Sequence, residues 1–154
     1  MLLAAMLMAA LVSCQKDDEV TPEPAEEVNP GITKMKITKI QVNSCSLSTD
    51  YDNDYTTPDY YIIVKTIHDC LLGSTEIRNN VSNMDLPLIY QTDFTVMDIN
   101  EVISFRFYDY DAGYENDDYI DGYNICPAYY LGNTAITLNA YDHELIFTIT
   151  VEWY

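Results

Sequence analysis

Basic residues are scarce in this sequence. The 154 residues include 7 Lys and Arg against 25 Asp and Glu, which gives a formal net charge of -18 at pH 7. This charge excludes nucleic-acid binding, because phosphate contacts need a cationic surface that releases counterions. The same charge repels an anionic membrane surface unless something neutralises it locally, and divalent cations are the obvious candidate.

Histidine and the motifs of common hydrolases are also rare or missing. The sequence has two histidines, His68 and His143, and neither G-x-S-x-G nor H-E-x-x-H occurs. A pair of carboxylates could act on glycosides because Asp is abundant, but a single short domain leaves little room for a cleft. We therefore expect no enzymatic activity and interpret both histidines as surface residues.

Closely spaced cysteines are absent, which disfavours zinc binding by thiolates. Behind Cys14 the chain has Cys45, Cys70 and Cys126, an odd set that allows at most one intrachain disulfide. We expect these three to be small buried residues, with or without one bridge.

No apolar run is long enough to span a membrane. The longest, residues 2–13, has twelve residues where a spanning helix needs about 20, and it stops at Ser13 and Cys14. Leu11-Val12-Ser13-Cys14 resembles the lipobox of bacterial lipoproteins. The resemblance implies a signal peptide over residues 1–13, cleavage before Cys14, and attachment to the membrane through a lipid on Cys14. A basic n-region is missing, which leaves the true start of the protein open.

A tether is expected over residues 14–31. The "QKDDE" that follows Cys14 resembles the acidic signal that sends some lipoproteins to the outer face of the bacterial outer membrane, and a solvated charge run is the alternative reading. "VTPEPAEEVNPG" holds three of the six prolines and reads as an extended linker. We therefore expect a lipoprotein of the bacterial outer membrane, with a folded domain over residues 32–154.

The domain shows the period-2 alternation of β-strands. In "ELIFTITVEWY" the apolar residues Leu145, Phe147, Ile149, Val151 and Trp153 share one face. The apolar phase of "MKITKIQV" slips between Ile37 and Ile40, which predicts a β-bulge. Eight strands are predicted, near residues 35–42, 59–67, 74–80, 92–97, 101–108, 119–125, 134–138 and 144–154. Turn-rich segments separate them, as in an antiparallel Greek-key β-sandwich.

Two acidic loops, "DYDNDYTTPD" (50–59) and "DYDAGYENDD" (109–118), each join two predicted strands. Carboxylates held close together repel by roughly 4 kcal/mol per pair at an effective dielectric near 20, so a bound cation would stabilise such a cluster. Calcium suits it, since calcium takes six to eight oxygen ligands in irregular geometry. Neither loop fits the EF-hand pattern, which puts Gly at position 6 and Glu at position 12.

The order of these segments over residues 35–154 resembles the C2 domain, a calcium-binding β-sandwich. "TPDYYIIV" is similar to the family's entry into a strand, with Asp59 at a liganding position and Tyr60 where the family has proline. "ISFRFYDYDAGYENDDYIDG" is similar to its D-x-D-x5-D loop, with Asp109, Asp111 and Asp117 at that spacing. The resemblance implies an eight-stranded C2-like sandwich, and a strand at the C-terminus favours the circularly shifted, type II strand order.

The resemblance also implies a calcium site between the two loops. Its expected ligands are Asp52, Asp54, Asp59, Asp109, Asp111, Asp117 and Asp118, where Asp52 and Asp54 flank the family position at Asn53, and Asp117 and Asp118 are alternatives. We expect a lipid-anchored domain that binds calcium and a surface ligand, which is a protein, a glycan or a lipid headgroup. The alternative is a sandwich with a degenerate site that serves as a structural subunit of the envelope.

Overall fold

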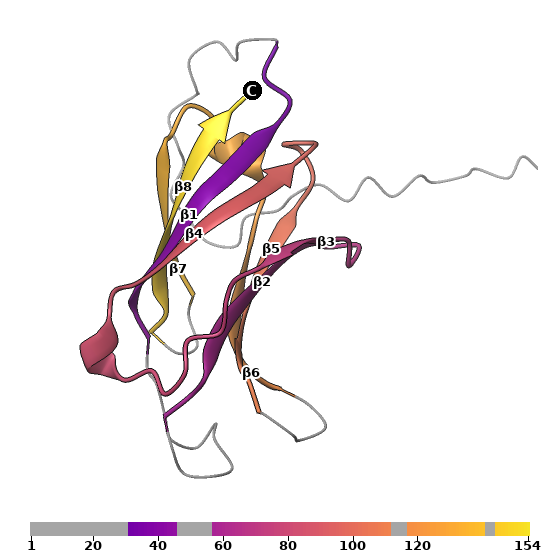
Figure 1. Ribbon diagram of the computed structural model, residues 1–154. Coiled ribbons are helices and arrows are strands. Elements are labelled where there is room, and N and C mark those ends of the chain that lie inside the picture. The colour runs from indigo at the N-terminus through magenta and orange to yellow at the C-terminus, as the bar shows by residue number, and fades with distance from the viewer. Residues whose placement is uncertain (1–30, 46–56, 112–116, 141–143) are drawn as a thin grey trace, which may run out of the picture.

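A computed structural model describes residues 31–45, 57–111, 117–140 and 144–154. These residues form eight strands in two antiparallel sheets (Figure 1). The strands are β1 (Met35–Ser44), β2 (Tyr60–Thr66), β3 (Leu71–Ser74), β4 (Leu88–Val96), β5 (Ile103–Asp109), β6 (Asp118–Ile125), β7 (Ala135–Asn139) and β8 (Ile146–Trp153). Two short 3-10 helices cover Asn83–Asp85 and Pro127–Tyr130. The predicted β-sandwich is confirmed.

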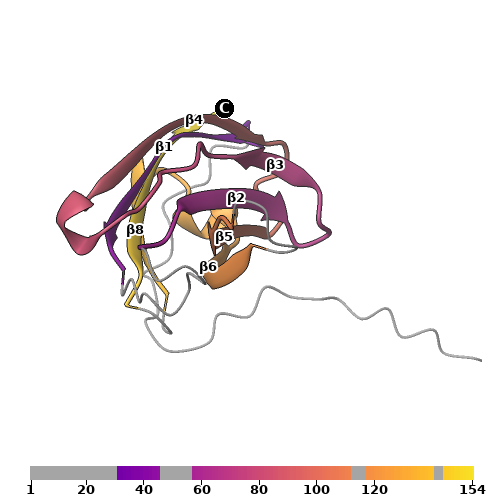
Figure 2. The same ribbon diagram turned by 60° about the horizontal axis from the view of Figure 1, so that its bottom comes forward.

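The two sheets have the orders β4-β1-β8-β7 and β3-β2-β5-β6. They lie face to face as two layers, which Figure 2 shows from one end of the sandwich. Edge strands β3 and β4 belong to different sheets and lie on the same open side of the sandwich. The start of β2, the end of β5 and the start of β6 lie together at one end, because Tyr60, Asp109 and Asp118 are cross-strand partners.

Aromatic side chains join the two layers in the core. Phe147 of β8 packs against Phe105 and Phe107 of β5, with ring centroids 5.2 and 5.0 Å apart. All three are fully buried. The period-2 alternation produces this contact, since it turns every second residue of each strand toward the facing sheet.

The β-bulge predicted in β1 is confirmed. The register of β1 with both β4 and β8 shifts between Ile37 and Lys39. Thr38 is the extra residue in the pairing with β8, whereas in the pairing with β4 it lies opposite two residues, Thr92 and Asp93. Its hydroxyl donates a 3.2 Å hydrogen bond to the carbonyl of Thr150. The bulge returns Ile40 to the inner face, where both Ile37 and Ile40 are fully buried.

One predicted strand is wrong. Instead of residues 74–80, β3 covers only Leu71–Ser74, and the following segment touches β2 through the isolated bridge between Tyr60 and Arg78. The prediction failed because "STEIRNN" shows an alternating pattern although it lies outside the core. The strand that does form contains a glycine, Gly73, and an exposed leucine, Leu71.

Two further expectations concern the cysteines and membrane spans. No disulfide joins any two of Cys45, Cys70 and Cys126; Cys45 and Cys126 are buried, as expected, whereas Cys70 is exposed. In the part of the chain that the structure describes, no helix has the length and apolar character needed to cross a membrane.

Candidate metal site

The acidic end of β5 is buried. The alternation that turns Phe105 and Phe107 into the core also turns Asp109 inward, at the last position of the strand. Asp109 and Asp111 are only 1% and 7% exposed. Burial of carboxylates is costly unless hydrogen bonds or a cation compensate their charge, so this end of the sandwich is a place where a cation would be stabilised.

Asp59 lies directly beside Asp109. The backbone N–H of Asp59 donates a 2.6 Å hydrogen bond to Oδ1 of Asp109, and the N–H of Tyr110 donates to the Asp59 carbonyl at 2.8 Å. Oδ1 of Asp59 accepts a 2.7 Å hydrogen bond from the N–H of Asn80. Asn80 has a φ of 54°, a conformation that asparagine tolerates better than most residues. The 109–110 segment thereby holds the Asp59 backbone, and Asn80 holds the Asp59 carboxylate.

Asp117 lies on the other side of Asp111. The backbone N–H of Asp111 is 3.4 Å from Oδ1 of Asp117, and the Tyr61 hydroxyl donates a 2.5 Å hydrogen bond to Oδ2. Burial, followed by this hydrogen bond, raises the pKa of Tyr61 well above its usual range. The phenol therefore stays protonated and keeps donating to the carboxylate at any physiological pH.

The structure places some of the predicted ligands and not others. Asp59 contacts Asp109, and Asp111 contacts Asp117, near the ends of β2, β5 and β6, whereas Asp118 is exposed and is the cross-strand partner of Asp109. Asp52, Asp54 and the predicted lipidation site Cys14 lie outside the described residues.

As ligands, these four aspartates offer oxygen atoms only. Oxygen donors fit a hard cation such as calcium, and zinc would prefer imidazole or thiolate. Among the described residues, no group of three or more Asp, Glu, His or Cys side chains is arranged to enclose an ion by itself. An enclosed metal site would therefore need ligands beyond these four carboxylates.

Asp121 is a buried acidic residue that the sequence reading did not assign to the site. β6 shifts register with β5 between Phe107 and Tyr108, which makes Ile120 the extra residue and turns both Ile120 and Asp121 inward. Oδ1 of Asp121 accepts a 2.6 Å hydrogen bond from the N–H of Gly122. A glycine inside a strand often marks a bulge, so Gly122 was the available signal.

Cys45, the last described residue before the first acidic loop, lies near Asp121. Its Sγ accepts a 3.8 Å hydrogen bond from the hydroxyl of Tyr60, which is fully buried. Burial raises the pKa of the Cys45 thiol to about 11, the Tyr60 contact opposes that rise, and the Asp121 charge adds to it. A thiol with this pKa stays protonated at neutral pH and is a poor metal ligand.

Comparison with solved structures identifies the fold. The chain is similar to "Structure of a C2 domain" at a TM-score of 0.53 and 15% identity, over 77% of this chain and 97% of that one. It is similar to a C2 domain of plant Extended Synaptotagmin 1 at 0.57 and 14%, over 80% and 93%. It is also similar to human GIVD cytosolic phospholipase A2, in complex with an inhibitor and terbium chloride, at 0.57 and 14%, over 80% of this chain and 18% of that one.

These likenesses show that the chain has the fold of a C2 domain. No protein-family description matches the sequence, and no curated protein matches it. At 14 to 15% identity the structural likeness concerns the fold alone. The comparisons do not distinguish the family's two strand orders, so the type II order stays a prediction.

Proposed function

We propose that this chain is a lipid-anchored envelope protein whose C2-like domain binds calcium at its acidic end and, with it, a surface ligand. One observation carries the calcium proposal: buried Asp109 accepts the Asp59 N–H, so two predicted ligands from different loops are held side by side. A rigid sandwich holds such loop ends in fixed positions. Oxygen ligands that are already in position favour calcium bound to the protein over calcium hydrated in water.

The proposed ligands are Asp59, Asp109, Asp111 and Asp117 from the described residues, with Asp52 and Asp54 completing the set from the first loop. Asp117 is preferred to Asp118 because it contacts the Asp111 backbone and is held by Tyr61, whereas Asp118 is exposed. The bound ion supplies positive charge that lowers the repulsion between these carboxylates. It also gives a protein of net charge -18 a local contact point for an anionic group.

Terbium luminescence tests the calcium proposal. Tb³⁺ is a hard ion that prefers oxygen ligands, and a nearby tyrosine sensitises its emission; Tyr61 contacts Asp117, and Tyr110 follows Asp109 directly. The chain from Gln15 onward should give saturable emission on excitation of tyrosine, and millimolar calcium should displace it. Human GIVD cytosolic phospholipase A2, one of the similar structures, was solved in complex with terbium chloride.

Asp109→Asn and Asp98→Asn form a matched pair for this experiment. Asp98 is an exposed aspartate in the turn between β4 and β5, at the end of β5 that lies away from Asp109. The Asp109 substitution should abolish the sensitised emission, and the Asp98 substitution should leave it unchanged. Equal emission from both variants would place the ion elsewhere on the acidic surface and overturn the assignment.

A second candidate function rests on hydrogen bonds that already occupy two of the carboxylates. Asp59 accepts from Asn80, and Asp117 accepts from Tyr61. These contacts suit a degenerate site in a structural subunit of the envelope, where the aspartates only tie loops together. In that case the melting temperature is the same in EDTA and in millimolar calcium.

The lipid anchor has an independent test. Cells that express the chain and are fed labelled palmitate should incorporate the label into the wild type and not into Cys14→Ser. Digestion of intact cells by an added protease then distinguishes a protein on the outer face of the outer membrane from one on the inner face. Absence of label from the wild type would contradict the lipoprotein proposal and leave the calcium proposal untouched.

A further inference from the structure

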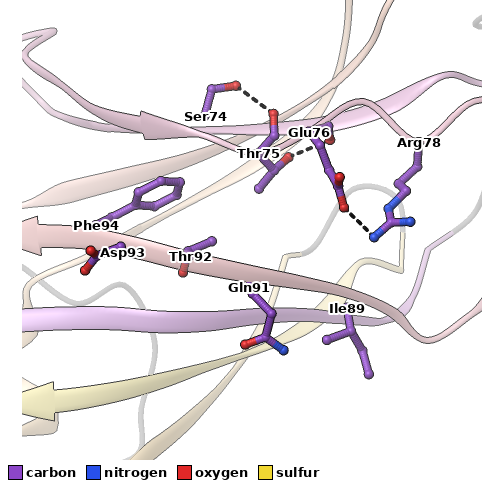
Figure 3. A pocket seen from close by; sticks show the side chains of 9 residues that line it. All are labelled: Ser74, Thr75, Glu76, Arg78, Ile89, Gln91, Thr92, Asp93 and Phe94. Atoms are coloured by element: carbon purple, nitrogen blue, oxygen red, sulfur yellow. Dashed lines mark hydrogen bonds and ion pairs between the residues drawn. The ribbon is translucent and has the colours of Figure 1, made fainter.

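A groove lies on the open side of the sandwich, between the edge strands of the two sheets. Its volume is about 540 Å³, and its walls are residues 74–78, at and after the end of β3, and residues 89–94 of β4. This volume is within the range of small-ligand sites, roughly 300–1,000 Å³. Figure 3 shows the two walls as facing segments, with Phe94 of β4 directed toward β3.

Hydrogen bonds to β2 hold the first wall in place. The N–H of Thr75 donates to the Ile62 carbonyl at 2.9 Å, and the N–H of Ile62 donates to the Thr75 hydroxyl at 2.9 Å. Further along, Arg78 and Tyr60 exchange two backbone hydrogen bonds of 2.8 and 2.9 Å. The wall is therefore preformed although it is not a continuous strand.

The second wall is the outer part of β4, and Phe94 closes one end of the groove. A Cβ added to Gly73 would come within 2.1 Å of the Phe94 ring, so the ring lies directly on the glycine backbone of β3. Ile89 is 45% exposed and lies on the same strand nearer the metal site. The groove therefore offers an aromatic ring and an aliphatic side chain among polar groups.

The groove is locally neutral although the protein is strongly acidic. Arg78 pairs with Glu76, and the Arg78 guanidinium also lies 5.7 Å from the centre of the Tyr90 ring. Asp93 pairs with Lys36 at 2.5 Å. Two of the chain's few cations thus balance the two carboxylates that line the groove. This balance favours neither a polyanion nor a polycation.

We propose that this groove binds a neutral, polyhydroxylated ligand, namely a glycan chain without charged groups. Sugar hydroxyls both donate and accept, and the groove supplies planar groups of both kinds in the Gln91 amide and the Glu76–Arg78 pair. The Phe94 ring and Ile89 contact the apolar faces of sugar rings. The inference rests on the proposed function only in taking the chain as a ligand-binding domain, and it names the ligand class.

Affinity electrophoresis tests the proposal. The chain from Gln15 onward is run in native gels that contain a mannan, a galactomannan, a β-1,3-glucan or dextran as neutral probes, and polygalacturonate or heparin as anionic ones. At least one neutral polysaccharide should retard it, and neither anionic one should. Gln91→Ala and Glu76→Ala should each lower the affinity that the retardation measures by at least about tenfold, an effect that the loss of one good hydrogen bond accounts for.

Thr95→Ala is the matched control, since Thr95 is exposed on the same strand and does not line the groove. It should be retarded like the wild type, and all three variants should keep the wild-type melting temperature. Retardation should persist in EDTA and in Asp109→Asn, which separates this proposal from the calcium proposal. Retardation by anionic polysaccharides only, retardation unchanged in Gln91→Ala and Glu76→Ala, or no retardation by any neutral probe would overturn it.

Discussion

The Asp59 backbone N–H donates a 2.6 Å hydrogen bond to Oδ1 of Asp109, and this bond ties the residue before β2 to the last residue of β5. The Asp109 carboxylate therefore has a structural role whether or not an ion is present. Asp111, two residues on, contacts Asp117 through its backbone, which a side-chain substitution preserves. The two aspartates should respond differently to mutation.

Asp109→Ala should destabilise the calcium-free protein. It removes the acceptor of the Asp59 N–H at a position that is 1% exposed, and an unsatisfied buried donor costs about 1–3 kcal/mol. Asp109→Asn keeps an oxygen acceptor and should cost less. Urea unfolding in EDTA measures both, and equal stabilities for the alanine and asparagine variants would show that the hydrogen bond contributes nothing.

Asp111→Asn should remove most of the response to calcium while leaving the calcium-free fold as stable as the wild type or more so. The substitution removes one of two neighbouring buried charges, which lowers their repulsion. For the wild type, calcium at 100 times its dissociation constant adds about 2.7 kcal/mol to the free energy of unfolding. Melting curves in EDTA and in calcium check this, and a variant that keeps the full calcium shift would contradict the role of Asp111.

Tyr61→Phe should weaken calcium binding without unfolding the domain. The Tyr61 hydroxyl donates to Oδ2 of Asp117 and fixes the orientation of a proposed ligand. Loss of such a supporting hydrogen bond typically costs about 10–100-fold in metal affinity. Tyr119→Phe is the control, because its hydroxyl accepts from Arg106 instead of contacting a carboxylate. Isothermal titration with calcium compares them, and equal affinities would show that the Tyr61 hydrogen bond does not support the site.

Cys45 should make stability fall as the pH rises from 9 to 11. Burial raises the pKa of this thiol from 9.0 to about 11, so the folded state holds the proton over a range in which the unfolded chain releases it. The stabilisation that the buried, protonated thiol contributes is complete below pH 9 and is lost as the pH passes 11. This difference in pKa corresponds to at most about 2.7 kcal/mol.

Two cysteine variants separate this effect from other titrations. Cys45→Ala should show a smaller loss of stability between pH 9 and 11 than the wild type, and Cys70→Ala, which changes an exposed thiol, should show the same loss. Denaturant melts at each pH provide the measurement. If the stability of Cys45→Ala falls with pH as steeply as that of the wild type, the pH dependence belongs to other groups, such as the tyrosines.

The sheets could be predicted from the sequence because their signal is local. Residues such as Phe105, Phe107 and Phe147 alternate with polar ones, and alternation alone decides which residues face inward. The bulge at Thr38 was readable for the same reason. β3 was missed because an exposed edge strand of four residues leaves no alternation of buried side chains.

The acidic site could be predicted only in part. Spacing indicated Asp109 and Asp111, but it carried no information on Asn80, which fixes Asp59 through tertiary contact. Asp121 was missed because the register shift in β6 turns it inward beside Ile120, where a strict alternation of side chains turns it outward. The groove could not be foreseen at all, because it depends on how far apart two sheets hold β3 and β4 and on ion pairs between distant residues, such as Lys36 with Asp93.

Gly73→Ala should open the closed end of the groove and destabilise the fold. The new Cβ would lie 2.1 Å from the Phe94 ring, so the ring must move away from β3, and such overpacking typically costs about 1–3 kcal/mol. In a Phe94→Ala background the new methyl group meets no ring, so the same substitution should cost much less. Urea unfolding of the two single variants and the double variant gives the coupling energy. Additive losses would mean that the Phe94 ring does not rest on Gly73, and that this end of the groove is open in solution.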